Sequence, residues 1–380
     1  MVKIEGDIAT MIRMMYVGTH VHNVQDSMYL IFRVAESLGI EVYWAADFSK
    51  FKGCIEDIPC HVLQTDFSRH PMISKNNLRA IRQLRRYIRE NNIDFVHCNT
   101  PIGSFCGRIA SRMEKIHPVL YTAHGLPYYH GAPVTRNVFK VIEYFLSFFT
   151  DYAVAMNEED YLALQKLPLR KKRVYKINGV GIPLQENHPK VRMDKRAELG
   201  IDASTPVVIC VGRLEKIKGV DISLRAFAAV SSKDAVLLIC GEGVEKEKLI
   251  QLAIELGIQD RVRFLGFRTD VYDLLSASDC YLLNSFYEGL PRSLMEAMNA
   301  KVACVVSKAR GNIDLIHDQV NGLVVDIGDV AQTTEALNSL LSSPSDRKRY
   351  IDQAYSDVQQ YGMDVVYDQY REIYRDMLGI

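Results

Sequence analysis

The chain has 380 residues, more than one folding core usually holds, so its length predicts two domains. Its formal net charge is zero, which gives no support to nucleic-acid binding or to a strongly acidic partner. The charge is unevenly divided: residues 1–184 hold 23 basic and 17 acidic side chains (+6), and residues 185–380 hold 23 and 29 (−6).

Cysteine usage and hydropathy limit where the protein acts. The eight cysteines include no Cys-x-x-Cys pair, and several lie in apolar runs such as "VVICVG", as buried thiols in a reducing cytosol do. The N-terminal stretch lacks the apolar segment of a signal peptide, and no run reaches the ~20 apolar residues of a membrane span. We therefore expect a cytoplasmic protein, free or on the cytoplasmic face of the membrane.

In the first half, short apolar runs alternate with stretches of helical periodicity. The helical pattern is clearest at 74–91 and 136–149. Strand alternating with helix is typical of a parallel sheet with helices on both faces. The runs predict strands at 13–18, 41–46, 94–98, 118–124, 151–156 and 173–179.

The same alternation starts again after the aperiodic, Gly- and Pro-containing stretch "INGVGIPLQENHPKVRMD". We therefore predict an α/β protein of two doubly wound, Rossmann-like domains, at 1–184 and 185–363. In such sheets ligands collect at the carboxyl ends of the strands, so two facing domains would form a cleft. The second set of strands is predicted at 206–213, 235–243, 261–266, 280–284, 301–307 and 322–325.

Two motifs follow the first two strands of the second domain. In "VGRLEKIKG", Arg213 and Lys218 would project from the strand end, where two cations suit a diphosphate, and Gly212 permits a tight backbone. The alternative is an ordinary solvent-exposed loop without a ligand, and the spacing of these residues does not exclude it. In "CGEGVEKEKL", the turn of Gly241, Glu242 and Gly243 lets a ligand approach backbone N–H groups, but it lacks the full Gly-x-Gly-x-x-Gly fingerprint.

The stretch "SFYEGLPRSLMEAM" gives a stronger signal. Pro291 suits the first position of a helix, so Glu288, Gly289 and Leu290 would lead into a helix over 292–298 and offer an anion site at its start. Phosphate would sit at this helix start, sugar hydroxyls at Glu288, and ribose hydroxyls at Glu296, about two turns further on. Two solvated glutamates are the usual alternative, but they leave the Gly-Leu-Pro start unexplained.

Together "EGLPRSLME", "VGRLEKIKG" and "GEG" resemble the group-1 glycosyltransferases (glycosyltransferase family 4), retaining enzymes of the GT-B fold. The segments "SKNNLRAIRQLRRYIRENNIDFVHCNTP", "YTAHGLPYYHGAP" and "TDYAVAMNEEDY" resemble the branch that builds capsular and exopolysaccharide repeat units. In that branch His is frequent where this chain has Asn99. The resemblance spans most of the chain.

The resemblance implies a role for each matching residue. Glu288 would contact the donor sugar, Glu296 the ribose, and Arg213 and Lys218 the pyrophosphate, while His124 would lie over the sugar at the reacting centre.

It also implies that backbone near Phe267 and Arg268 holds the base, and that the terminal helix 364–380 crosses back onto the first domain. Gly18 and His20, in the N-terminal loop, would contact either the donor or the acceptor.

The expected reaction is sugar transfer from a nucleotide-sugar donor to a glycan or to a polyprenyl-diphosphate-linked sugar. Family membership implies retention of configuration and makes UDP the default nucleotide. The sequence contains no Asp-x-Asp and no His/Cys set with metal-ligand spacing, so we expect no metal and no other cofactor.

A peripheral membrane contact is a further expectation. Arginines recur at helical spacing in "LRAIRQLRRYIRE", opposite an apolar stripe of Leu78, Ile81, Leu84 and Ile88, and an aromatic helix follows in "NVFKVIEYFLSFF". Basic and apolar side chains together suit anionic lipid head groups. Equally, the stripe would pack on the sheet and leave the arginines solvated.

Two other functions remain open at this point. A nucleotide-sugar epimerase of similar architecture would turn over the donor without an acceptor. A nucleotide-sugar-binding protein that has lost catalysis would bind the donor without turnover. A nicotinamide dehydrogenase is disfavoured by the missing glycine fingerprint.

Overall fold

The structure, a computed structural model, describes residues 11–21, 26–68, 72–126, 133–186 and 189–380. It divides into two compact units, Met1–Gly181 with Met363–Ile380, and Ile182–Gly362. The expected boundaries at 184/185 and 363/364 lie slightly further along the chain. Ile182 accounts for the first difference, since its N–H bonds the Tyr361 carbonyl and its side chain is fully buried in the core of the second unit.

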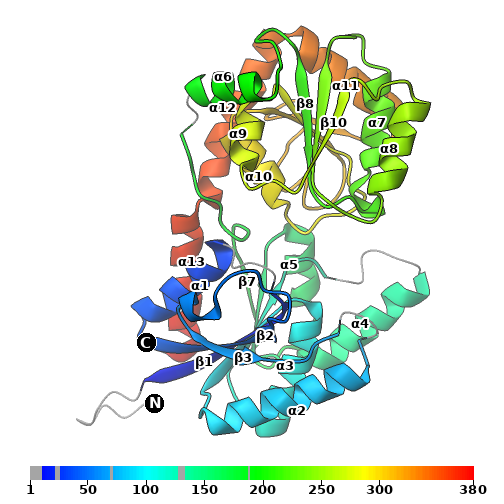
Figure 1. The fold of residues 1–380 in the computed structure, drawn as a ribbon. Helices are drawn as coiled ribbons and strands as arrows, with labels where there is room; N and C mark the ends of the chain where they lie inside the picture. The colour runs from blue at the N-terminus through cyan, green and yellow to red at the C-terminus, as the bar shows by residue number, and fades with distance from the viewer. Residues whose placement is uncertain (1–10, 22–25, 69–71, 127–132, 187–188) are drawn as a thin grey trace. The chain divides into compact units, whose positions relative to one another are not determined.

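The first unit contains a seven-stranded sheet in the order β3-β2-β1-β4-β5-β6-β7, with every neighbouring pair parallel (Figure 1). Its strands are β1 (Ile12–His20), β2 (Ile40–Asp47), β3 (His61–Gln64), β4 (Phe95–Asn99), β5 (Val119–Ala123), β6 (Tyr152–Ala155) and β7 (Arg173–Lys176). Its α-helices are α1 (Asp26–Ser37), α2 (Lys75–Glu90), α3 (Pro101–Glu114), α4 (Pro133–Ser147), α5 (Glu158–Gln165) and α13 (Met363–Leu378).

The second unit contains a six-stranded parallel sheet in the order β10-β9-β8-β11-β12-β13. Its strands are β8 (Val207–Val211), β9 (Val236–Cys240), β10 (Val262–Gly266), β11 (Cys280–Leu283), β12 (Ala303–Ser307) and β13 (Leu323–Val325). Its α-helices are α6 (Pro189–Glu198), α7 (Val220–Ala228), α8 (Lys246–Glu255), α9 (Val271–Ser276), α10 (Arg292–Asn299), α11 (Val330–Ser342) and α12 (Pro344–Val358).

These elements confirm the predicted fold class. Strands such as β8 and β12 are continuous apolar runs because a parallel sheet covered by helices is buried on both faces. The apolar run at 280–284 is β11, which is fully buried, and the helical pattern at 74–91 is α2. The short strand β3 was not predicted, since it lies at the edge of its sheet and its side chains are only partly buried.

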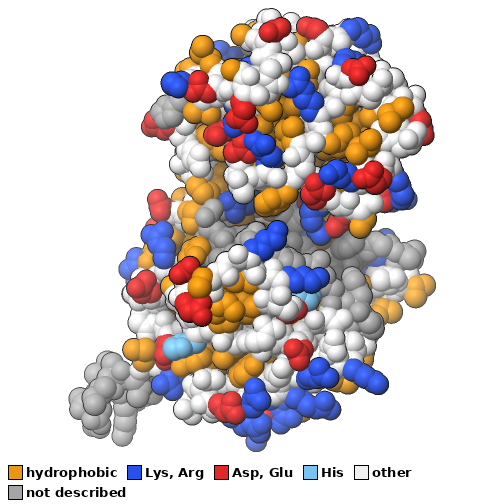
Figure 2. Space-filling model, in the orientation of Figure 1, with side chains coloured by type: hydrophobic (Ala, Val, Ile, Leu, Met, Phe, Trp, Pro, Cys, Tyr) orange, Lys and Arg blue, Asp and Glu red, His pale blue; other side chains and the backbone are white. Residues whose placement is uncertain are grey.

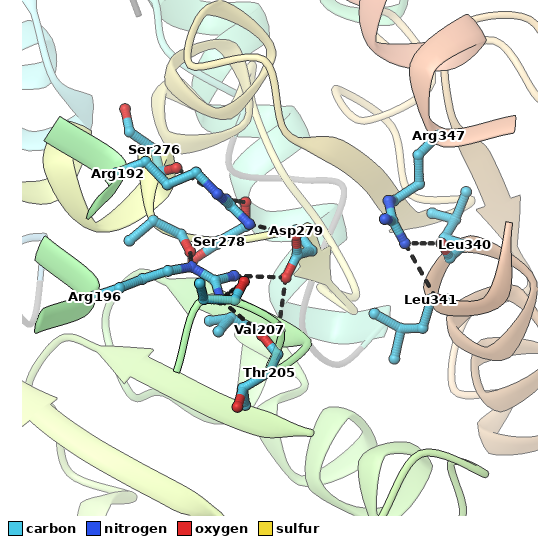
Figure 3. Close-up of polar contacts among 12 residues, drawn as sticks. Arg192, Arg196, Thr205, Val207, Ser276, Ser278, Asp279, Leu340, Leu341 and Arg347 are labelled. Carbon is cyan, nitrogen blue, oxygen red and sulfur yellow. Dashed lines mark hydrogen bonds and ion pairs between the residues drawn. The ribbon is translucent and has the colours of Figure 1, made fainter. Parts of the chain in front are cut away.

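A buried arginine ties α6 to the sheet of the second unit. The Arg196 guanidinium donates to one Asp279 carboxylate oxygen at 2.8 Å, and the same oxygen accepts the N–H of Val207 at the start of β8 (Figure 3). Further donations from Arg196 reach backbone carbonyls, including that of Thr205. This network lies at the amino-terminal ends of β8 and β11 and so anchors the sheet rather than its ligand-binding edge.

Helix α13 is held in the first unit by a buried histidine on β4. The His97 ring is hydrogen-bonded to the Tyr374 hydroxyl at 2.7 Å and to the Thr122 hydroxyl at 2.8 Å, and His97 is wholly buried. Burial lowers the pKa of His97 to about 3, with a smaller contribution from His124. The imidazole therefore stays neutral in the folded protein at any pH near neutrality.

This histidine should make the first unit sensitive to acid. Below its ordinary pKa of about 6.5 His97 gains a proton only on unfolding, so the free energy of unfolding falls as the pH drops. Between pH 6.5 and pH 5 we expect a loss of about 2 kcal/mol from this residue. Urea denaturation at several pH values checks it: His97→Gln should flatten the pH dependence, and an unchanged slope would contradict the assignment.

Candidate functional site

The second unit has a topological switch point between β8 and β11. These strands are neighbours in the sheet, while the chain leaves β8 toward β9 on one side and passes from β11 toward β12 on the other. Parallel sheets bind ligands in the crevice at the carboxyl ends of two such strands. The predicted motifs "VGRLEKIKG" and "SFYEGLPRSLMEAM" begin at these two strand ends.

Close backbone packing brings the two motifs together. The loop after β8 forms a short 3₁₀ turn, Lys216–Lys218, and reverses at Gly219, whose φ is +58°. A Cβ added to Gly219 would lie 2.1 Å from the backbone oxygen of Asn284, just after β11. Only glycine permits both this approach and this backbone conformation.

Lys218 and Glu288 meet at the switch point. The Lys218 ammonium donates to a Glu288 carboxylate oxygen at 2.7 Å, although the residues are 70 positions apart. Glu288 is only 8% exposed, so the pair is largely removed from water. An ion pair at this depth needs a supporting scaffold, because desolvation opposes the attraction between the charges.

Buried polar side chains fix the loop that carries Glu288. The Ser307 hydroxyl donates to the backbone oxygen of Ser285, and the Asn312 amide donates to both Ser307 and Ser285. Asn284 donates to the Ser223 hydroxyl in α7. Sequence reasoning missed these supporting residues, since a single Asn or Ser carries no signal until the loops are placed side by side.

Helix α10 begins beside Glu288. It starts at Arg292, as expected for a helix over 292–298, and Pro291 is its N-cap in extended conformation rather than its first helical residue. The N–H groups of a first turn have no partner within the helix and attract anions. Its inward face is buried at Leu294, Met295 and Met298.

Glu296 lies one turn into α10 and is 23% exposed at its side chain. Its carboxylate accepts from the Arg292 guanidinium at 2.7 Å. Arg292 was not among the predicted site residues, and it gives Glu296 a partner four positions earlier on the same helix. The Arg292 guanidinium therefore holds the Glu296 carboxylate in one orientation.

The two predicted cations have different surroundings. Arg213 and Lys218 line one small cavity at the end of β8, together with Gly212. Arg213 is much more exposed and pairs with Glu215 at 2.6 Å, not with Glu288. Lys218 is thus held in place, whereas Arg213 lies at the surface of its loop.

The glycines after β9 have a packing role that the sequence did not disclose. A Cβ on Gly241 would lie 1.8 Å from the Gly212 oxygen, and one on Gly243 would lie 2.2 Å from the Leu214 oxygen. The turn therefore packs backbone to backbone against the loop that carries Arg213. Glu242 pairs with Lys246 at the surface. Nucleotide binding by this turn remains a prediction.

The segment after β10 is exposed at Phe267, which is 68% accessible. Arg268 binds Asp270 through two nitrogens, at 2.7 and 2.5 Å, and Lys195 donates to the same carboxylate at 2.7 Å. Hydrogen bonding from Arg268 lowers the pKa of Asp270 below its ordinary value. The Arg268 side chain is thus occupied, which leaves backbone groups as the predicted base contact.

In the first unit, the corresponding switch point lies between β1 and β4. Gly18 and His20 are in β1 itself rather than in the loop where they were expected, and His20 bonds Asp47 at 2.9 Å. A Cβ on Gly103 would lie 2.7 Å from the Gly18 oxygen, so α3 approaches this strand end closely.

His124 directly follows β5 and is exposed to solvent. Its Nε2 contacts the side-chain oxygen of Asn99, which can only accept, so Nε2 carries the hydrogen. Asn99 in turn donates to the Tyr16 hydroxyl. Desolvation by the surrounding protein atoms lowers the pKa of His124 to about 4, although part of the residue is accessible to solvent, so the ring is neutral at pH 7. Part of the motif after His124, residues 127–132, lies outside the described residues.

Within the described parts of the chain, no group of three or more His, Cys, Asp and Glu side chains could hold a metal ion. Over the same residues, no helix has both the length and the apolar character that crossing a bilayer requires.

Known proteins resemble this chain in sequence and in fold. Residues 191–357 match the family model described as glycosyl transferases group 1, and residues 48–155 match the model described as glycosyl transferase 4-like. A Bacillus subtilis (strain 168) glycosyltransferase named EpsD is 31% identical over 276 residues, which cover 70% of this chain and 72% of EpsD.

An Escherichia coli enzyme, UDP-Gal:alpha-D-GlcNAc-diphosphoundecaprenol alpha-1,3-galactosyltransferase, is 25% identical over 270 residues, 69% of this chain and 70% of that enzyme. The crystal structure of Anabaena HepE in complex with UDP and glucose matches with a TM-score of 0.80 at 22% identity, over 96% of this chain and 100% of HepE. The structural match confirms the expected two-domain fold.

Proposed function

Since the chain belongs to the group-1 glycosyltransferases, we propose that it transfers a sugar from a UDP-sugar to a polyprenyl-diphosphate-linked sugar or related glycan, with retention of anomeric configuration, in capsular or exopolysaccharide assembly. Glycosyltransferase activity itself follows from the family. The finer statement is supported by the names of relatives, one of which uses UDP-Gal and a diphosphoundecaprenol-linked acceptor.

One observation supports the donor site above all others. Lys218 and Glu288 join at the switch point of the second unit, directly before the start of α10. A cation and a helix start suit a diphosphate, and an adjacent buried carboxylate suits sugar hydroxyls. No feature of an ordinary solvated loop requires this arrangement.

The chemistry proposed for these groups is electrostatic. Negative charge grows on the diphosphate as the bond to the anomeric carbon breaks, and donors that are already in place stabilise it without reorganisation. Lys218, Arg213 and the first-turn N–H groups of α10 would supply that stabilisation. We propose that they act without a metal ion.

The other predicted residues complete the proposal. Glu288 would orient the donor sugar and Glu296 the ribose, while backbone near Phe267 would hold the base. His124, neutral and fixed in one tautomer by Asn99, would contact the sugar near the reacting carbon.

Ligand-induced thermal stabilisation tests the donor, because binding to the folded state raises the melting temperature. We expect UDP and one or more UDP-sugars to stabilise the chain more than other nucleoside diphosphates do, both with and without EDTA. Release of UDP should then require a lipid-linked acceptor. Turnover of the UDP-sugar without acceptor would favour an epimerase, binding without turnover would favour an inactive protein, and strict dependence on Mn²⁺ or Mg²⁺ would overturn the metal-free proposal.

A further inference from the structure

Helix α4 presents an apolar face to solvent. Val134, Val138, Val141, Phe145 and Phe148 recur at intervals of four and three residues, which places them on one side of the helix, and each is between 44% and 76% exposed. Tyr144 lies beside them and is 49% exposed. Scattered exposed apolar residues are ordinary, but a continuous stripe of this length indicates a binding surface.

The opposite side of α4 prevents the helix from turning this stripe inward. Glu143 is buried and accepts two hydrogen bonds from the buried Arg108 of α3, at 2.6 and 3.1 Å. Arg108 also lies over the Tyr121 ring, 4.1 Å from its centroid. Rotation of α4 that turned the stripe inward would break the buried ion pair between Arg108 and Glu143, so the stripe stays exposed to solvent.

Helix α5 widens the apolar surface into a groove. The groove has a volume of about 740 Å³, and its walls include Tyr144 and Phe145 from α4 with Leu162 and Leu167 from α5 and the residues after it. Leu162 is 47% exposed. The charged side chains at its edge are Lys140, Glu159 and Lys166. We call the stripe and this groove the α4–α5 face.

Basic residues flank the α4–α5 face. The segment after α5 contains Lys166, Arg170, Lys171 and Lys172, all exposed. The N–H of Arg170 bonds the Thr150 oxygen and that of Lys171 bonds the Asp151 oxygen, which places this segment beside the carboxyl end of α4. Arg170 pairs with Asp151.

Helix α2, which the sequence also suggested as a membrane-contact helix, does not expose its apolar stripe. Ile81, Leu84 and Ile88 are buried in the core of the first unit, and of the predicted apolar stripe only Leu78 is exposed. Figure 2 shows basic side chains along α2, without the continuous apolar face that insertion requires. The packed-stripe alternative is therefore the correct one for α2.

We propose that the α4–α5 face is a membrane-contact surface, which inserts its apolar side chains at the boundary between head groups and acyl chains of a bilayer rich in anionic lipid. An apolar helix face with basic residues beside it has this preference. This proposal rests on the proposed function, because contact with the membrane would bring the protein to a lipid-linked acceptor.

The flanking charge favours a bilayer over a second copy of the chain. A symmetric pair formed through this face would bring the same basic segment of both copies to one interface, and like charges there oppose association. Anionic head groups would instead neutralise them. Self-association is therefore an outcome that the experiment must be able to detect.

Co-sedimentation of the full chain with vesicles tests the proposal. We expect binding to phosphatidylcholine vesicles that contain phosphatidylglycerol, weaker binding without it, and weakening by salt. The double variant Phe145→Ser with Phe148→Ser should bind roughly tenfold more weakly or worse. The matched control, Ile73→Ser with Leu78→Ser, replaces two exposed apolar residues near α2 and should bind as the wild type does.

Three results would overturn the proposal: no binding of the wild type to anionic vesicles at low salt, wild-type binding by the Phe145/Phe148 variant, or a dimer of the wild type that this variant dissociates. Lys171→Glu with Lys172→Glu should reduce binding to anionic vesicles only. UDP-induced thermal stabilisation is measured for every variant in parallel. If UDP does not stabilise the wild type, the result counts against the donor site. If UDP stabilises the wild type but the wild type does not bind vesicles, the result counts against the α4–α5 face alone.

Discussion

Replacement of Lys218 by methionine should lower sugar transfer by about 10²–10³-fold, the usual effect of removing a group that stabilises charge in a transition state. Methionine keeps the length of the side chain but removes the ammonium that contacts Glu288 at 2.7 Å. The leaving diphosphate would lose its most firmly held cation. Steady-state kinetics with saturating donor should show the loss mainly in kcat.

The variant also leaves Glu288 buried without its partner, which should cost ~1–3 kcal/mol of stability. Combining Lys218→Met with Glu288→Gln removes both charges and should recover part of that stability without recovering transfer. Lys216→Met is the matched control, because Lys216 lies in the same turn and is exposed. Turnover by Lys218→Met equal to that of the control would refute the role of Lys218.

Glu296→Gln should weaken UDP binding by about 10–100-fold, since hydrogen bonds to a charged group are worth about 1.5–3 kcal/mol. Glutamine preserves the shape of the side chain while removing the carboxylate that would accept both ribose hydroxyls. Stability should change little, because the partly exposed pair of Glu296 with Arg292 is an i,i+4 ion pair, which contributes a few tenths of a kcal/mol. Calorimetric titration measures the affinity.

Two comparisons separate ribose binding from ion pairing. Arg292→Gln removes the partner of Glu296 but keeps the carboxylate, so it should weaken UDP binding less than Glu296→Gln does. A UDP analogue without the ribose 2′ and 3′ hydroxyls should bind the wild type weakly and lose little more in Glu296→Gln. If that analogue distinguishes the two proteins as strongly as UDP does, Glu296 does not act on the ribose.

The candidate site was predictable where local chemistry leaves few alternatives. Pro291 and the residues before it mark a helix start, and α10 begins at Arg292, where it was expected. Glycine after β8 and β9 signals close backbone approach, and the structure shows that Gly241 lies against the Gly212 oxygen. A glycine in the sequence indicates that a side chain would not fit at that position, but it does not indicate which atoms lie against the backbone there.

Contacts between distant segments were not predictable. Nothing in the two motifs states that Lys218 bonds Glu288 while Arg213 turns to Glu215. Asn99 illustrates the same limit: in the sequence it is a departure from related chains, whereas in the structure it holds the His124 ring through one hydrogen bond.

The sequence by itself determined the class of fold and the positions of most strands, because apolar runs and helical periods follow directly from which side chains must leave water. Only the tertiary structure decided which amphipathic helix keeps its apolar side exposed. Periodicity reports that a helix has an apolar side, but not whether a sheet covers it: α2 packs that side into the core, while the buried pair of Arg108 and Glu143 holds the apolar side of α4 in solvent.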